Sequence, residues 1–117
     1  MTIGISVKIA LDYDNCTTRD REFWFDFCEL AEMAGHEVRI VTARSPDLDN
    51  IDDRAWGIPV IYCNGVAKLF VCTHFADDGK GWVPDIWIDD KPKSILENSG
   101  ASPEALIEWR KSPEHSL

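Results

Sequence analysis

The chain has 117 residues, of which 44% are hydrophobic and 28% are charged. This length suits a single domain over residues 1–117, and the composition excludes a chain that is disordered or collagen-like throughout. The net charge of −9 argues against broad binding to nucleic acids or anionic membranes, and no apolar run is long enough to span a bilayer.

The cysteines indicate a reducing compartment rather than a disulfide framework. Cys16, Cys28, Cys63 and Cys72 lie far apart, and no pair has the spacing of a structural zinc site. No signal-peptide pattern precedes them, so we expect reduced thiols in a cytoplasmic protein.

The first half of the chain predicts a strand, a helix and a second strand. The apolar run 7–11 predicts a buried strand that ends in the acidic turn 12–15. Thr17 is expected to cap a helix that Gly35 ends. The expected buried face of this helix consists of apolar residues at helical spacing: Phe23, Phe27, Leu30, Ala31 and Ala34. Residues 38–41 predict the second strand.

The second half of the chain continues this alternation. A short helix is predicted from Ser45 toward Trp56, and two strands are predicted at 58–63 and 86–88. Further helices are expected over 66–76, after Pro92 and after Ser102.

Four strands that alternate with helices predict an α/β fold. We expect a Rossmann-like three-layer α/β/α sandwich with a mainly parallel sheet. The segments between the strands leave no room for a cap domain. Ligands of such sheets bind beyond the carboxyl ends of the strands, so polar residues at those ends are the candidates for a site.

Polar side chains follow three of the predicted strands directly. They are Asp12 and Asp14, then Thr42 and Arg44, then Asp89 and Asp90. Four carboxylates at one edge would repel one another unless a cation neutralised them, and an oxygen-only ligand set favours a hard ion such as Mg²⁺. The alternative is that each acidic pair is a solvated turn, where Asp is common. Two such pairs and a Thr at strand ends favour a site.

These residues resemble the motifs of the haloacid dehalogenase (HAD) superfamily of phosphotransferases. The segment Leu11-Asp12-Tyr13-Asp14-Asn15 is similar to its D-x-D motif, 38–42 to its strand ending in Thr or Ser, and 87–90 to its terminal acidic pair. The order and spacing match over residues 5–95. The chain departs from the family at Asn15-Cys16, where Gly-Thr is usual, but Asn also accepts a left-handed backbone.

The resemblance implies a Mg²⁺-dependent phosphomonoester hydrolase, a phosphatase that forms an aspartyl-phosphate. Asp12 would be the nucleophile, and Asp14 would be the general acid and then the general base. Thr42 would donate its hydroxyl to a phosphoryl oxygen.

The resemblance also implies a metal site and a catalytic lysine. Asp12, Asp90 and the backbone carbonyl of Asp14 would bind Mg²⁺, and Asp89 would orient the lysine. Two lysines, Lys68 and Lys80, lie between the second motif and the acidic pair. We favour Lys68 because it follows a predicted strand end closely.

Arg44 and Asn15 are expected to bind the substrate. Arg44 resembles the arginine that follows the second motif in capless polynucleotide 3′-phosphatases and some nucleotidases. The phosphorylated substrate is therefore expected to be a small molecule, such as a nucleotide, or a nucleic-acid end. A capless site is open, so a large substrate, a partner or a second copy of the chain is expected to close it.

Two other functions have the same fold. A receiver-like phosphoacceptor domain requires an Asp after the third strand, but that strand ends in Tyr62-Cys63-Asn64. A non-catalytic binding module would be favoured by replacement of Asp12 or Asp14, and both are present.

Overall fold

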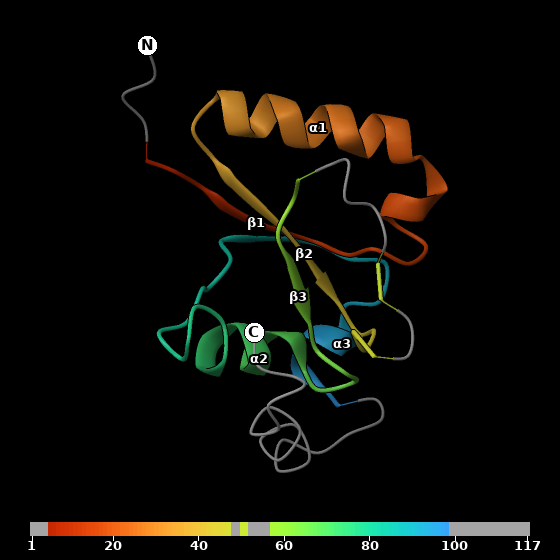
Figure 1. Ribbon diagram of the computed structural model, residues 1–117, viewed down its shortest axis with the longest axis vertical. Helices are drawn as coiled ribbons and strands as arrows, with labels where there is room; N and C mark the ends of the chain where they lie inside the picture. The colour runs from red at the N-terminus through yellow and green to blue at the C-terminus, as the bar shows by residue number, and fades with distance from the viewer. Residues whose placement is uncertain (1–4, 48–49, 52–56, 99–117) are drawn as a thin grey trace.

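The computed structural model describes residues 5–47, 50–51 and 57–98 (Figure 1). In this part of the chain, four parallel strands form one sheet in the order β3-β2-β1-β4. The strands are β1 (Lys8–Leu11), β2 (Glu37–Thr42), β3 (Val60–Tyr62) and β4 (Ile86–Ile88). The helices are the 3-10 helix η1 (Thr17–Arg19), α1 (Arg21–Met33), α2 (Lys68–His74) and α3 (Lys93–Leu96). The predicted α/β fold with a parallel sheet is confirmed.

Helices cover both faces of the sheet. Figure 1 shows α1 on one face and α2 with α3 on the other. Successive residues of a strand point to opposite faces. In β1, Ile9 and Leu11 accordingly pack in the cluster that contains Cys28 of α1, whereas Ala10 packs in the cluster that contains Val71 of α2. Burial on both faces explains why residues 9–11 of β1 form a continuous apolar run.

The strand order reverses direction between β1 and β4. The chain proceeds from β1 to β2 and β3 on one side, and β4 then pairs with the other side of β1. The backbone N–H of Asp12 donates to the carbonyl of Ile88 at 2.9 Å, so the segments after β1 and β4 leave the sheet side by side. Ligands bind at such switch points in open α/β sheets.

The helix after β1 begins later than predicted. The carboxylate of Asp20 accepts from the backbone N–H of Phe23 at 3.1 Å and caps α1. Thr17, the predicted cap, lies in η1, is fully buried and donates its hydroxyl to the carbonyl of Asp12 at 2.6 Å. That tertiary hydrogen bond fixes the turn after β1.

The buried face of α1 is also rotated from the predicted one. Phe23 and Leu30 are 54% and 66% exposed, while Trp24 and Cys28 pack on the sheet together with Phe27. Phe27 and Ala31 belong to both the predicted and the observed buried face, so helical periodicity alone could not separate the two.

The remaining elements are shorter than predicted or lie partly outside the description. The predicted helices 66–76 and after Pro92 are confirmed as α2 and α3, and the strand 58–63 as β3. The predicted helix from Ser45 toward Trp56 lies mostly outside the described residues, and the one after Ser102 lies wholly outside them. The described connections form no separate cap domain. No helix within the described ranges has the length and apolarity to cross a membrane.

Candidate functional site

Lys68 is the centre of a buried ionic cluster beyond the carboxyl ends of β1 and β4. Its Nζ donates to Oδ1 of Asp12 at 2.9 Å and to Oδ2 of Asp89 at 2.6 Å. Lys68 is only 2% exposed, and the side chain of Asp89 is 3% exposed. Charges so far from water require partners, so the lysine and the two carboxylates depend on one another.

The start of α2 is fixed in a way that directs Lys68 toward β1. The side-chain oxygen of Asn98, beyond α3, accepts from the backbone N–H of Ala67 at 2.9 Å. The turn before α2 uses left-handed backbone at Asn64 and Gly65, with φ of 50° and 76°. The N–H groups of this turn donate to carbonyls of the segment after β2. The first turn of α2 is thereby tied to two neighbouring strand ends.

The carboxyl group of Asp12 lies in an environment short of positive charge. Burial and the neighbouring Asp90 raise the pKa of Asp12 to about 7, although Lys68 acts in the opposite direction. Burial lowers the pKa of Lys68, but its hydrogen bonds to Asp89 and Asp12 raise it overall. The lysine is therefore an ammonium at neutral pH, and one ammonium does not satisfy the carboxylates around it.

The carboxylates at this edge fit a divalent cation. Asp12, Asp89 and Asp90 each offer an oxygen, and these oxygens lie within 4.8 Å of one another. An all-oxygen set suits Mg²⁺, and the raised pKa of Asp12 shows that further positive charge would be favourable there. The oxygens of Asp89 already accept from Lys68 and from the backbone N–H of Lys91. Asp12 and Asp90 are therefore the better candidate ligands.

Arg44 binds Asp14. Its Nε donates to Oδ2 of Asp14 at 2.9 Å, and its Nη2 donates to Oδ1 at 2.6 Å. This hydrogen bonding lowers the pKa of Asp14. The carboxylate of Asp14 is not a member of the three-carboxylate cluster. Metal binding through its backbone carbonyl, and its acid–base role, stay predictions.

Thr42 and Asn15 shape the turns that carry these residues. Thr42 is fully buried, and its Oγ1 accepts from the backbone N–H of Arg44 at 3.2 Å. Its contact with a phosphoryl group stays a prediction. The left-handed backbone predicted for Asn15 is confirmed by a φ of 59°, and its N–H donates to Oγ1 of Thr18 at 3.0 Å. Asn15 is exposed, and binding of substrate to it stays a prediction.

The structure brings Lys68, and not Lys80, to the carboxylates. Lys80 is exposed in the loop beyond the other end of α2. Cys16 also lies near the cluster, with its Sγ 3.9 Å from the carbonyl of Ile88. Burial and nearby carboxylates raise the pKa of Cys16, so it remains a thiol near neutral pH.

Sequence reasoning missed two residues that support the site. The ring of Tyr13 is buried, with the guanidinium of Arg44 4.9 Å from its centre. Its place between Asp12 and Asp14 was the available signal. Asn98, which binds the start of α2, lies in a polar stretch without a pattern that would have identified it.

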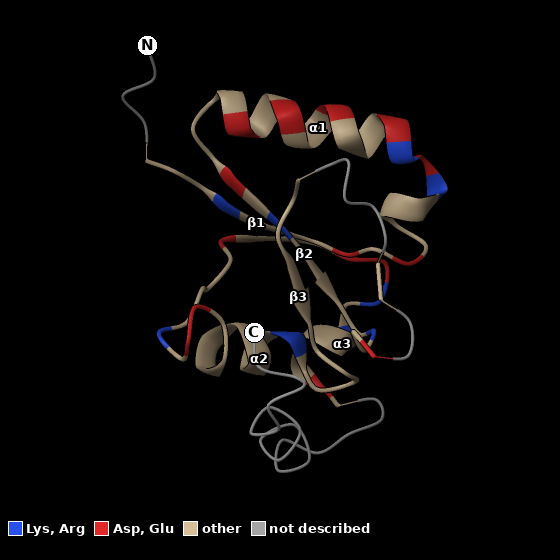
Figure 2. Ribbon diagram, viewed as in Figure 1, with Lys and Arg blue, Asp and Glu red and all other residues tan. Residues whose placement is uncertain are grey.

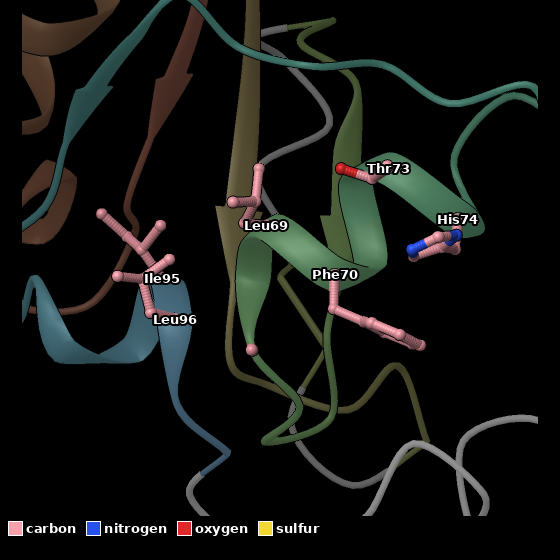
Figure 3. A pocket seen from close by; sticks show the side chains of 7 residues that line it. Leu69, Phe70, Thr73, His74, Ile95 and Leu96 are labelled. Atoms are coloured by element: carbon pink, nitrogen blue, oxygen red, sulfur yellow. The ribbon is translucent and has the colours of Figure 1, made fainter.

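A cavity of about 290 Å³ between α2 and α3 is distinct from the ionic cluster. Figure 3 shows that its labelled side chains come from α2 and α3: Leu69, Phe70, Thr73, His74, Ile95 and Leu96. Lys68 lies on the buried face of the same helix. The mostly apolar lining does not suit a phosphoryl group.

The acidic residues of the chain are not confined to the site. Figure 2 shows acidic residues along the length of α1, and these side chains (Glu22, Asp26, Glu29 and Glu32) are exposed. The net charge of −9 therefore reflects solvated surface as well as the cluster.

Comparisons of the chain with protein-family models, with curated proteins and with solved structures gave no match.

Proposed function

We propose that this protein is a Mg²⁺-dependent phosphomonoester hydrolase of the HAD type, with Asp12 as its nucleophile. The observation that carries the proposal is the buried Lys68, which joins Asp12 to Asp89 at the switch point of the sheet. Buried ion pairs cost desolvation energy and contribute little net stability, so function is the better reason for this one. The motif resemblance supplies the roles.

Asp12 and Asp14 divide the chemistry between them. A carboxylate oxygen of Asp12 attacks phosphorus, and the ester oxygen leaves with a proton from Asp14. Asp14 then takes a proton from the water that attacks the aspartyl-phosphate, which releases phosphate and restores Asp12. Lys68 holds the nucleophile in place and offsets the charge of the phosphoryl group.

The charge balance at this edge supports a divalent cation. The carboxylates of Asp12, Asp14, Asp89 and Asp90 face two cations, Lys68 and Arg44. When all four carboxyl groups are ionised, two negative charges are left over, which one Mg²⁺ would balance. Mg²⁺ would be held by Asp12 and Asp90, with the carbonyl of Asp14, and when bound it would offset the repulsion between carboxylate and phosphate.

The motif resemblance alone leads us to propose a nucleotide or a phosphorylated nucleic-acid end as the substrate. Its phosphoryl group must reach Asp12, which is 8% exposed, from the side of the more exposed Asp90 and Asp14.

Phosphate release from a panel of phosphomonoesters tests the proposal. The panel contains mononucleotides, oligonucleotides phosphorylated at the 3′ or 5′ end, and sugar phosphates, each with Mg²⁺ or with chelator. We expect Mg²⁺-dependent release that Asp12→Asn abolishes and that the matched surface variant Lys80→Met retains. Stable phosphorylation of Asp12 without release would instead indicate a phosphoacceptor domain. The proposal is refuted if no substrate in the panel gives either phosphate release or phosphorylation of Asp12.

A further inference from the structure

Arg44 holds Asp14 with two parts of its guanidinium group. The two hydrogen bonds, at 2.9 and 2.6 Å, reach both oxygens of the carboxylate. The side chain of Asp14 is 50% exposed, so packing alone leaves it free to rotate. A fork of this kind fixes the plane of the carboxylate as well as its position.

The backbone and the guanidinium group of Arg44 also contact residues other than Asp14. Its backbone N–H donates to Oγ1 of the buried Thr42 at 3.2 Å, and its carbonyl accepts from the N–H of Asn64 at 3.2 Å. Its guanidinium lies over the buried ring of Tyr13. The ends of β2 and β3 therefore support the arginine.

We propose that Arg44 is a positioning residue that acts through Asp14, rather than a group that binds the substrate. This inference rests on the proposed function, in which Asp14 transfers the proton. The Nε and Nη2 edge of the guanidinium is occupied by Asp14, so a phosphoryl group could bind that edge of Arg44 only by displacing Asp14. Thr42 is in turn the support for Arg44.

If Arg44 positions Asp14, its replacement should have a specific kinetic effect. Asp14 gives its proton to the ester oxygen as the P–O bond breaks, and it recovers a proton from the attacking water. A misplaced Asp14 slows the first step most for an alkyl leaving group, because nitrophenolate leaves without protonation. A lost substrate contact would instead raise KM for both kinds of substrate.

The test compares Arg44→Gln, Arg44→Lys, Asp14→Asn and the double variant Asp14→Asn/Arg44→Gln on nitrophenyl phosphate and on an alkyl phosphate, at saturating Mg²⁺. We expect Arg44→Gln to lower kcat for the alkyl ester about tenfold more than for the nitrophenyl ester, with KM changed less than about threefold. The double variant should be no slower than Asp14→Asn, because both changes remove the same contribution. Arg44→Lys should resemble Arg44→Gln, since an ammonium cannot form the fork.

Arg39→Gln is the matched control. Arg39 also binds a carboxylate with two nitrogens, that of Asp77 at 2.9 and 3.3 Å, and it lies 4.6 Å from the ring centre of Trp82. Arg39 lies outside the site, so Arg39→Gln should keep the wild-type kcat and KM at temperatures below the unfolding midpoint of the variant.

Three results would overturn the positioning role. They are an equal rise of KM on both esters in Arg44→Gln, restoration of KM by Arg44→Lys, or additive losses in the double variant. Any of them in an active wild-type background leaves the phosphatase proposal intact. A wild-type protein that releases no phosphate from either ester refutes the proposed function itself, and the role of Arg44 with it.

Discussion

Replacement of Lys68 by Met should destabilise the protein more at pH 8 than at pH 5. Met removes the ammonium that donates to Asp12 and Asp89 but retains an apolar stem. Breaking a buried ion pair costs about 3–5 kcal/mol, because the remaining charges lose their partner. Three carboxylates with oxygens within 4.8 Å of one another then repel at pH 8. Protonation relieves this repulsion at pH 5, since the pKa of Asp12 is about 7 even with Lys68 present.

The expected difference is large enough to measure. At pH 8 the loss of about 3–5 kcal/mol should lower the unfolding midpoint by roughly 10–20 °C. At pH 5 the loss should be smaller by up to about 1.4 kcal/mol, the free energy of one pKa unit, because pH 8 lies about one unit above the pKa of Asp12, about 7.

Urea unfolding in chelator, followed by tryptophan fluorescence, measures the free energy of unfolding at pH 8 and at pH 5, and thermal unfolding measures the midpoint temperature. The control is Lys80→Met, which should change the free energy of unfolding by less than about 0.5 kcal/mol because Lys80 is exposed. We also expect Lys68→Met to lower the catalytic rate at least about a hundredfold and Lys80→Met to change it less than about threefold. The reasoning fails if Lys68→Met costs the same free energy at both pH values. A large loss of rate in Lys80→Met alone would make Lys80 the catalytic lysine.

Three further predictions concern the carboxylates. Asp12→Asn should abolish Mg²⁺-dependent phosphate release while preserving the fold, because the amide keeps the volume of the side chain; circular dichroism and a phosphate assay check this, and release at the wild-type rate would exclude Asp12 as nucleophile. Asp90→Ala should weaken Mg²⁺ binding more than Asp89→Ala, because Asp89 is bound to Lys68, and the reverse order in a Mg²⁺ titration would exchange their roles. The stabilisation of the fold by Mg²⁺ should grow between pH 6 and pH 8, because below the pKa of Asp12, about 7, the metal must displace a proton. In chelator the sign is opposite: the folded protein retains a proton that the unfolded chain, with a pKa of 3.8, has lost, so stability should fall as the pH rises from about 4 to 7. A melting-temperature shift by Mg²⁺ that is constant with pH would contradict this.

The sheet could be predicted from the sequence because its central strands, β1 and β2, are buried over most of their length. Such strands read as short apolar runs, and turn residues bound them. The details of α1 could not be predicted in this way. Thr17 and Asp20 are both good capping residues, and only the hydrogen bond from Thr17 to the carbonyl of Asp12 decides between them. The run 58–63 also gave no sign that regular pairing in β3 covers only Val60–Tyr62.

The meeting of Asp12, Asp89 and Asp90 could be predicted because each follows a strand of the same parallel sheet. The motif order left both Lys68 and Lys80 as candidates, and the short spacing from the predicted strand end favoured Lys68. The pairing of Arg44 with Asp14 was not predicted. It depends on β2 lying beside β1, in the register that pairs Leu11 with Ile40, and on the backbone of the turn after Thr42.

The position of β1 between β2 and β4 places the two carboxylates of the D-x-D segment in different surroundings. Asp12 is buried against Asp89 and Lys68, whereas Asp14 is half exposed and bound by Arg44. The pKa of Asp12 is therefore raised and that of Asp14 is lowered. A nucleophile must be ionised, so the raised pKa of Asp12 is unfavourable for attack until a cation lowers it. The lowered pKa of Asp14 keeps its carboxyl group ionised, as its second role requires, whereas its first role requires it to hold the proton that it gives to the ester oxygen. The surroundings of Asp12 thus make the proposed activity depend on a bound cation, and this dependence is the property that chelation tests most directly.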